Sequence, residues 1–374
     1  SILLRMKIAF IFRARNVHIL QRAKYLHNLG HQIVYFGFFP QDSDIDISNF
    51  SFIEFVDFTP VLNNISFLDF LINRKKIINE CIELHVDLVH ILSPIYFASY
   101  FSNKVPYIID NMGSDVICFP KYNLIRRLIY YFAFKGSSAV IQDSFVAKRA
   151  GIRLGARASS NHIMEVGVDF NIFNKNYGLV EAKENLKIDS NCRIIFSPRN
   201  MNENSNIDLI LDIVPSILDK YSDVIFIFAL TPTSDRLKHA FKEVVNKYGD
   251  RVRVEGYLDN IKEMPLYYSA SSLVLSIPTS DSFPLSVSES MACGALVLVS
   301  KHAWYKGKFI ENKHLHSTNL NREDLLDKIE FILNSHGTYI QDNAYDRVYS
   351  RYSNDVQVKK LDFLYKKVLR NAKS

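Results

Sequence analysis

Cysteine is scarce in this chain, and long apolar runs are absent. The 374 residues include only four cysteines, which are scattered without the spacing of a metal site. We expect Cys81 and Cys293, which lie in helical patterns, to be buried thiols in a reducing cytoplasm. No uninterrupted apolar run approaches the roughly 18 residues that a membrane-spanning helix needs. Residues 6–12, MKIAFIF, have no small-residue cleavage site after them, so they predict a first buried strand rather than a signal peptide.

The glycine motif of dinucleotide-binding proteins is also missing. The turn after the expected first strand has the sequence RARNVH (13–18) instead of G-x-G-x-x-G. The main sequence evidence for an oxidoreductase is therefore absent. Basic residues form no stripe interleaved with aromatics, and no zinc-finger or helix-turn-helix pattern is present. We therefore expect no nucleic-acid partner.

The charge of the chain is positive and unevenly spread. Apolar residues make up 48% of the sequence and charged residues 22%, which predicts a folded globular protein. Of the net charge of +6, residues 1–168 contribute +5, with 18 Lys and Arg against 13 Asp and Glu. Two explanations stay open: solvated helix faces, or a first half that rests on anionic lipid headgroups at the inner membrane.

Strand-like and helix-like runs alternate along the chain, as is typical of parallel α/β sheets. The expected strands of the first half lie near 6–12, 31–36, 51–56, 87–92, 106–110, 138–142 and 162–166, and its helices near 16–29, 66–85, 95–103, 122–135 and 143–154. The second half repeats the pattern, with strands near 192–197, 223–229, 251–255, 272–277 and 295–300 and helices near 206–220, 234–248, 260–270, 284–293 and 322–334. This pattern predicts an α/β protein of two Rossmann-like doubly wound domains that face across a ligand-binding cleft, joined near 168–190, with a terminal helix over 354–372.

The stretch 281–300, DSFPLSVSESMACGALVLVS, is the most informative one. Asp281 opens a short loop, and Glu289 follows eight positions later inside a helix. Gly294 ends that helix, and the apolar run 296–299 predicts a buried parallel strand. Two acids thus lie at and just inside a helix N-terminus, at the carboxyl edge of a sheet. That edge is where α/β proteins bind nucleotides and anions.

The sequence SDSFPLSVSESMACG (280–294) resembles the E-x7-E signature of the retaining glycosyltransferases of family 4, which have the GT-B fold. Three weaker similarities extend over most of the chain: Gly113-Ser114-Asp115, Gly167-Val168-Asp169 and Ser197-Pro198-Arg199. The resemblance implies an N-terminal acceptor domain of residues 1–168, to which the C-terminal helix 354–374 returns. It implies a donor domain of residues 169–353.

The resemblance also implies which residues bind a nucleotide-sugar donor. Glu289 would accept hydrogen bonds from the ribose hydroxyls, Asp281 from hydroxyls of the transferred sugar, and Arg199 would hold the diphosphate. These three are the expected catalytic residues. The donor would also contact the helix N-terminus and its loop, and the segment after the third strand of the second half: Ser282, Phe283, Pro284, Leu285, Tyr257 and Leu258.

The chain departs from the family pattern at four places, one of which is Asp281, a methylene shorter than the family's usual Glu. The Lys expected about five positions after Arg199 is missing, and Met112 stands where many members have a His. The first turn is basic instead of glycine-rich, which suits either exposed loop charges or contacts to an anion. The candidates for acceptor or sugar contacts are Arg13, Arg15, Asn16, Asn111, Gly113 and Asp115.

The resemblance implies a cytoplasmic hexosyltransferase that acts with retained anomeric configuration, and the basic first half suits peripheral contact with the inner membrane. Its acceptor would be a glycan or a lipid-linked glycan of a bacterial envelope polysaccharide. The family's chemistry implies no metal and no cofactor beyond the donor substrate. Two alternatives remain: a catalytically silent partner protein with this fold, and a nucleotide-sugar epimerase, for which the cleft would need further acid and base groups.

Overall fold

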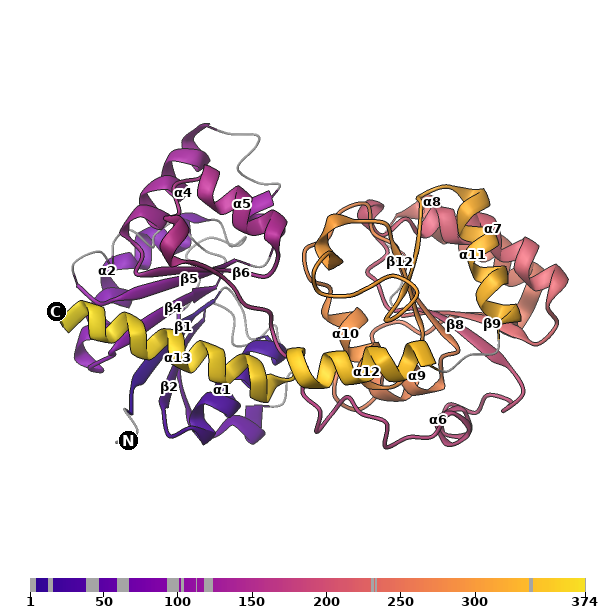
Figure 1. Ribbon diagram of the computed structural model, residues 1–374, viewed down its shortest axis with the longest axis horizontal. Coiled ribbons are helices and arrows are strands. Elements are labelled where there is room, and N and C mark those ends of the chain that lie inside the picture. Colours follow the sequence, from indigo (N-terminus) through magenta and orange to yellow (C-terminus); the bar gives the residue numbers. More distant parts are fainter. Residues whose placement is uncertain are drawn as a thin grey trace. The chain divides into compact units, whose positions relative to one another are not determined.

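The computed structural model describes residues 5–12, 16–37, 47–58, 67–92, 101, 104–111, 113–117, 124–229, 232, 234–335 and 339–373, with the backbone alone at 67–71, 114, 115, 303 and 373. The chain forms two compact units (Figure 1). The first unit comprises Ser1–Gly167 and Asn354–Ser374, and the second comprises Val168–Ser353. Within the described ranges, no helix has the length and apolar content that crossing a membrane requires.

The first unit is built on a seven-stranded parallel sheet in the order β3-β2-β1-β4-β5-β6-β7. Its strands are β1 (Lys7–Ile11), β2 (Gln32–Gly37), β3 (Ile53–Asp57), β4 (Leu88–Leu92), β5 (Tyr107–Asn111), β6 (Ala139–Gln142) and β7 (Asn161–Ile163). Its helices are α1 (Val17–Asn28), α2 (Phe67–Glu83), α3 (Ser114–Ile117), α4 (Leu124–Gly136), α5 (Phe145–Arg153) and α13 (Asn354–Lys373). The inner strands are apolar on both faces because helices cover both sides of a parallel sheet.

Successive residues of β1 pack into two different cores. Ile8 and Phe10 belong to the cluster with α1 and α13, whereas Ala9 and Ile11 belong to the cluster with α2 and α4. The two-residue period of a strand therefore distributes one apolar run over both faces of the sheet. This arrangement explains why residues 6–12 show no polar alternation.

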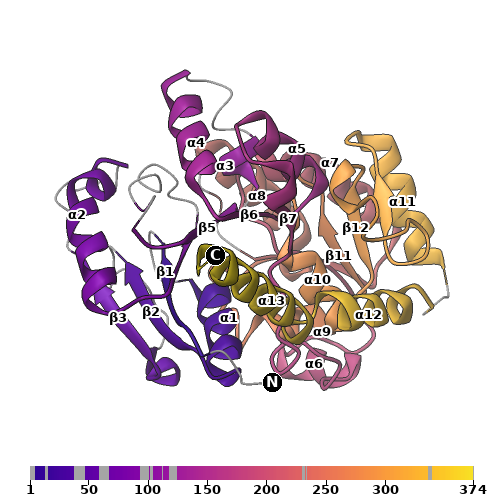
Figure 2. The same ribbon diagram turned by 60° about the vertical axis from the view of Figure 1, so that its left-hand side comes forward.

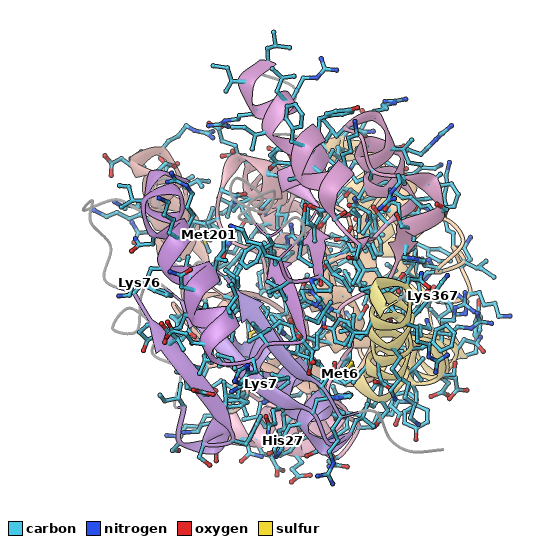
Figure 3. All side chains as sticks on the ribbon, turned by 90° about the vertical axis from the view of Figure 1, so that its left-hand side faces the viewer. Met6, Lys7, His27, Lys76, Met201 and Lys367 are labelled. Carbon is cyan, nitrogen blue, oxygen red and sulfur yellow. The ribbon has the colours of Figure 1, made fainter. Side chains whose placement is uncertain are left out.

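The C-terminal helix α13 returns to the first sheet and packs beside α1 (Figures 1 and 2). Its apolar stripe, Val358, Leu361, Leu364, Tyr365 and Val368, is buried. Side chains fill the space between α13 and the strands (Figure 3). The helix thus completes the core of the first unit, although more than 180 residues of the second unit separate it from Gly167 in the sequence.

A buried polar network lies beneath α13. The Arg22 guanidinium of α1 is 2.6 Å from a carboxylate oxygen of Asp110, and His90 Nε2 is 3.1 Å from the same oxygen. Burial alone would raise the pKa of Asp110, but Arg22 and His90 outweigh that effect and hold the pKa below its usual range. Burial lowers the pKa of His90, so its neutral ring donates from Nε2 to Asp110. The Tyr365 hydroxyl, 2.5 Å away, then donates to Nδ1.

The second unit contains a six-stranded parallel sheet in the order β10-β9-β8-β11-β12-β13. Its strands are β8 (Arg193–Ser197), β9 (Val224–Phe228), β10 (Val252–Val254), β11 (Leu273–Ser276), β12 (Val297–Ser300) and β13 (His316–Thr318). Its helices are α6 (Leu179–Asn185), α7 (Ile207–Lys220), α8 (Asp235–Tyr248), α9 (Met264–Ala270), α10 (Leu285–Ala292), α11 (Arg322–Asn334) and α12 (Tyr339–Tyr352). The strand order reverses between β8 and β11, which makes that pair the topological switch point of the sheet.

The two segments that pass between the units run side by side. In the second unit, the Val168 amide donates to the Tyr352 carbonyl at 2.8 Å. In the first unit, a Cβ atom on Gly167 would come within 2.6 Å of the Asn354 Cα atom. Only glycine allows this approach of two backbones, which explains the glycine of the Gly167-Val168-Asp169 motif.

The predicted fold class, two Rossmann-like parallel sheets with a C-terminal helix on the first domain, is confirmed. Cys81 and Cys293 are buried, as expected. The sequence does not predict four elements: α3, α6 within the expected join, β13 and α12. Most of the expected helix 95–103 lies outside the described residues.

We expect Arg22→Ala to destabilise the first unit strongly, because it leaves the Asp110 carboxylate buried without its cation. Breaking a buried ion pair in this way typically costs about 3–5 kcal/mol. Urea denaturation followed by circular dichroism measures the loss. Lys24→Ala, an exposed change on the same helix, is the matched control. Equal stability of the two variants would contradict the structural role of the network.

Candidate donor site

The predicted catalytic residues lie at the carboxyl ends of β8 and β11, the switch point of the second sheet. Arg199 follows β8 by two residues, and Asp281 lies in the loop between β11 and α10. Because β8 and β11 are hydrogen-bonded neighbours, the two segments emerge at the same edge of the sheet. The sheet therefore brings together two residues that are 82 positions apart in the sequence.

Arg199 and Asp281 form an ion pair. Arg199 Nη1 is 2.8 Å from Asp281 Oδ2, and both side chains are largely buried. The other carboxylate oxygen, Asp281 Oδ1, accepts a hydrogen bond from the Ser282 amide at 2.8 Å. The guanidinium is therefore held by a fixed carboxylate, and it has further N–H groups with which to bind an anion.

Two asparagines fasten the loop before Asp281. The Asn204 side chain donates to the Ser280 carbonyl at 2.9 Å and accepts from the Ser280 amide at 3.0 Å. The Asn206 side chain donates to the Ile277 carbonyl at 2.8 Å. Asn204 is five positions after Arg199, where the family pattern has its Lys. In this chain, that position anchors the loop instead of supplying a cation.

Glu289 lies on α10 with only 4% of its surface exposed. The Tyr268 hydroxyl of α9 donates to its carboxylate at 3.4 Å. Burial raises the pKa of Glu289 to about 8, and the hydrogen bond from Tyr268 offsets this only in part. Nothing in the sequence points to Tyr268, because a partner 21 residues away on another helix leaves no local pattern.

The N-terminus of α10 has no side-chain cap. Pro284 occupies the N-cap position, where it makes no side-chain hydrogen bond, and Leu285 begins the helix. The loop is held from below by Phe283, whose ring packs against Trp304, Phe309 and Tyr352. The side chain of Phe283 therefore belongs to the core. The first amides of α10 are suited to an anionic group, as at other helix N-termini.

The remaining donor candidates lie beyond the end of β10. Tyr257 is 69% exposed, whereas Leu258 is buried in the core of the second unit. Gly256, with φ of +83°, turns the chain between the strand and these residues. Of the two, Tyr257 has the exposed aromatic ring that stacking on a base requires.

The acceptor candidates lie in the first unit, and the structure describes only some of them. Arg13, Arg15 and the side chain of Asp115 lie outside the described residues. Asn16 caps α1 by accepting from the amides of His18 and Ile19. Asn111 ends β5, is buried and donates to the Ile141 carbonyl. Gly113, with φ of +93°, begins the turn into α3. Their contact with a ligand remains a prediction.

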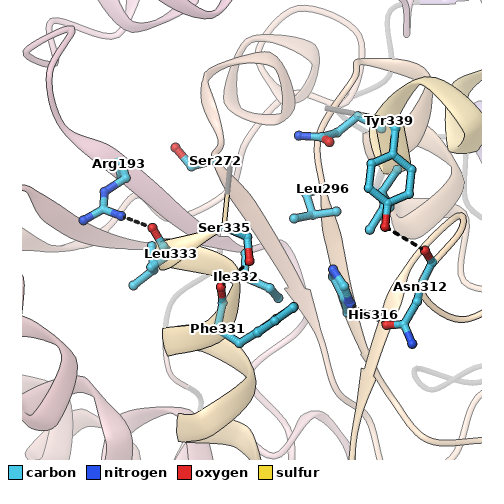
Figure 4. A pocket seen from close by; sticks show the side chains of 12 residues that line it. Arg193, Ser272, Leu296, Asn312, His316, Phe331, Ile332, Leu333, Ser335 and Tyr339 are labelled. Carbon is cyan, nitrogen blue, oxygen red and sulfur yellow. Dashed lines mark hydrogen bonds between the residues drawn. The ribbon is translucent and has the colours of Figure 1, made fainter. Parts of the chain in front are cut away.

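A hollow of about 680 Å³ in the second unit lies at the opposite edge of the sheet (Figure 4). Arg193, Ser272, Leu296 and His316, which line it, stand at or just before the first residues of β8, β11, β12 and β13. It is therefore separate from the site of Arg199, Asp281 and Glu289, which belong to the carboxyl edge.

Comparison with known families matches both halves of the chain. Residues 180–347 match the family "Glycosyl transferases group 1", and residues 7–144 match "Glycosyl transferase 4-like". No curated protein matches the chain in sequence.

Solved structures show the same fold over the whole chain. Sucrose-phosphate synthase from Thermosynechococcus elongatus has a TM-score of 0.81 at 16% identity, covering 98% of this chain and 100% of that one. A glycosyltransferase from Rickettsia africae has a TM-score of 0.80 at 19% identity, with 98% and 100% covered. Anabaena HepE in complex with UDP and glucose has a TM-score of 0.78 at 15% identity, with 97% and 100% covered.

The two parallel sheets and these matches define a GT-B glycosyltransferase. The chain belongs to the retaining glycosyltransferases of family 4, also called group 1, which use nucleotide-sugar donors.

We expect Glu289→Gln to stabilise the ligand-free protein. Between pH 4.5 and about 8, the unfolded chain releases the Glu289 proton while the folded chain retains it, so the wild type loses stability as pH rises. The neutral amide avoids this loss, which amounts to about 3 kcal/mol at pH 7.

Thermal unfolding at several pH values measures the effect. The melting temperature of Glu289→Gln should exceed that of the wild type by an amount that grows from pH 5 to pH 8. Glu184→Gln, an exposed change in the same unit, should show no such trend. A pH-independent difference at Glu289 would contradict the raised pKa.

Proposed function

We propose that this protein transfers a hexose from a nucleoside-diphosphate sugar to a glycan or lipid-linked acceptor with retention of anomeric configuration, in the assembly of a bacterial envelope polysaccharide. The observation that carries the proposal is the Arg199–Asp281 ion pair beside the uncapped N-terminus of α10. A guanidinium and the first amides of a helix, at the switch point of a parallel sheet, suit a diphosphate.

Each of the three catalytic residues has a separate role in this proposal. Arg199 and the first amides of α10 bind the diphosphate. Glu289 accepts hydrogen bonds from the ribose hydroxyls. These bonds take the place of the hydrogen bonds to water that the buried carboxyl group lacks. Asp281 positions Arg199 through one carboxylate oxygen, and its carboxylate also contacts the sugar hydroxyls beside the Arg199–Asp281 ion pair. Tyr257 supplies a ring face to the base, while Leu258 and Phe283 support the loops from the core.

The chemistry requires charge stabilisation and positioning more than titrating groups. The acceptor hydroxyl attacks the anomeric carbon on the face that the diphosphate leaves. The bond between that carbon and the phosphate oxygen breaks as the new glycosidic bond forms, and the hydroxyl proton passes to a phosphate oxygen. Arg199 and the helix amides stabilise the growing negative charge on the diphosphate. No metal and no additional cofactor is needed, as is usual in this family.

The acceptor is proposed to lie in the first unit, near the basic turn and the ends of β5 and α3. Asn16, Asn111 and Gly113 belong to this region, together with Arg13, Arg15 and Asp115. A cytoplasmic location, peripheral on the inner membrane, would give the enzyme access to a lipid-linked acceptor. A nucleotide sugar is made in the same compartment.

A silent partner protein is the second candidate, because Asn204 stands in place of the family's Lys and its side chain is engaged with Ser280. Such a protein would keep the fold without turnover. Nucleotide-sugar binding followed by transfer or hydrolysis of the donor separates the two candidates.

We expect UDP-glucose, the ligand of one Anabaena HepE complex, to raise the melting temperature of the wild type. Arg199→Ala should weaken UDP and UDP-glucose binding alike by at least about tenfold, since it removes a charge-assisted contact to the diphosphate. Asp281→Asn should reduce transfer more than it reduces UDP binding. Isothermal calorimetry measures both affinities.

Arg236→Ala, at an exposed arginine of the same unit, is the control and should leave both affinities unchanged. Undiminished UDP binding by Arg199→Ala would refute the site. Binding without any transfer or hydrolysis would support the silent partner.

We also expect Asn204→Ala to loosen the loop that carries Asp281. Loss of its two hydrogen bonds to Ser280 should lower UDP-glucose affinity about fivefold. Asn204→Asp, which retains only the acceptor for the Ser280 amide, should lie between the alanine variant and the wild type. Glu203→Ala, at the exposed neighbouring position, is the control. Equal affinities for all three variants would exclude a positioning role for Asn204.

A further inference from the structure

Helix α4 has an apolar face that no described part of the chain covers. Tyr130, Ala133 and Phe134 face the core of the first unit. The opposite face, at helical spacing, carries Leu124, Ile125, Leu128 and Phe132, all more than half exposed. Leu124 is 71% exposed. A surface helix normally carries polar side chains on its outward face, so the outward face of α4 is unusual.

Helix α5 extends the apolar surface. Phe145 is 64% exposed and Ile152 is 42% exposed. The two helices are neighbours, because the Tyr131 ring of α4 lies against Gly155, just after α5. Leu124, Ile125, Leu128, Phe132, Phe145 and Ile152 are here called the α4–α5 surface. Eight of the 21 large apolar side chains that are exposed in the described residues fall within 124–152, so the clustering is local.

The same segment is strongly basic. Residues 124–164 contain seven Lys and Arg (Arg126, Arg127, Lys135, Lys148, Arg149, Arg153 and Arg157) and one acidic residue, Asp143. This balance of +6 equals the formal net charge of the whole chain. The positive charge is therefore concentrated in the segment of the chain that carries the exposed apolar side chains. In Figure 3, α4 is the helix at the top of the view.

Exposed apolar side chains flanked by Arg and Lys match the chemistry of an anionic bilayer surface. The apolar groups enter the boundary between headgroups and acyl chains, while the cations remain with the phosphates. We propose that the α4–α5 surface docks this protein on anionic lipid membranes. This deepens the proposed function, since it would bring the enzyme to a lipid-linked acceptor. The docking itself requires neither donor nor acceptor.

Sedimentation of the full chain with sucrose-loaded vesicles tests the proposal. The wild type should bind vesicles of equimolar phosphatidylglycerol and phosphatidylcholine, and should bind phosphatidylcholine vesicles at least tenfold more weakly. Leu128→Ser with Phe132→Ser should weaken binding to the anionic vesicles at least tenfold. Arg127→Gln with Arg149→Gln should weaken it severalfold, and added salt should remove most of the remaining charge dependence.

Matched controls distinguish the surface from a general effect of exposed apolar groups. Phe363→Ser removes a 70% exposed phenylalanine of α13 in the same unit and should bind as the wild type does, whereas Phe132→Ser should not. Phe132→Trp adds a reporter whose emission should shift to the blue on anionic vesicles. The only native tryptophan, Trp304, is buried in the second unit and should not contribute to the shift.

Three results would overturn the proposal. These are no binding to anionic vesicles, equal binding by Phe132→Ser and Phe363→Ser, or a solution dimer of the wild type that Leu128→Ser with Phe132→Ser dissociates. The last result would assign the surface to a second copy of the chain. UDP-glucose binding is measured with the same preparations, so that a failure of membrane docking can be distinguished from a failure of the proposed function. If that binding persists without vesicle binding, only the docking proposal fails.

Discussion

Two carboxyl groups of this protein are buried away from water, one in the core of the first unit and one in the candidate donor site, and the protein compensates for the burial of only the first. Asp110 in the first unit and Glu289 in the second are both nearly inaccessible to water. Arg22 compensates for the burial of Asp110, whose pKa is lowered, so this carboxylate is stable in its charged form without a ligand. Burial dominates at Glu289 and raises its pKa to about 8. A carboxyl group in that condition gains from any ligand that brings hydroxyl donors to it, which is the property expected of a donor-binding residue.

The switch point of the second sheet explains why the site is where it is. Chain segments leave β8 and β11 at one edge and diverge to opposite sides, so no regular element fills the space between them. The Arg199–Asp281 pair and the Asn204–Ser280 hydrogen bonds join these two segments. Position 204 thus lacks the cation of the family pattern, and the Asn204 side chain instead holds the loop in place. A preorganised Arg199 loses less conformational freedom on binding a diphosphate, and this offsets part of the missing charge.

The fold followed from the sequence because its signals are local. Buried parallel strands are short apolar runs, and the helices between them have apolar periodicity, so the sequence predicts almost every element of residues 192–334, with β13 as an exception. What the sequence did not predict depends on contacts between distant residues. Tyr268 meets Glu289 from another helix, and the glycine at 167 is explained only by Asn354. The sequence does not predict α12, because its charged and aromatic residues, such as Arg347 and Tyr349, obscure a narrow apolar stripe. The E-x7-E resemblance pointed to Asp281 and Glu289, but it did not predict that Asp281 pairs with Arg199.

The uneven charge of the chain also acquires a physical explanation. A basic first half by itself suits either solvated helices or a lipid surface. Solvated helices place their apolar side chains inward and their charges outward, whereas α4 places Leu124, Leu128 and Phe132 outward among the charges. That orientation is costly in water, since apolar area of this size is normally buried. It is favourable where one surface offers both hydrocarbon and negative charge. The two explanations therefore differ in the orientation of one helix, and the orientation of α4 favours the lipid surface.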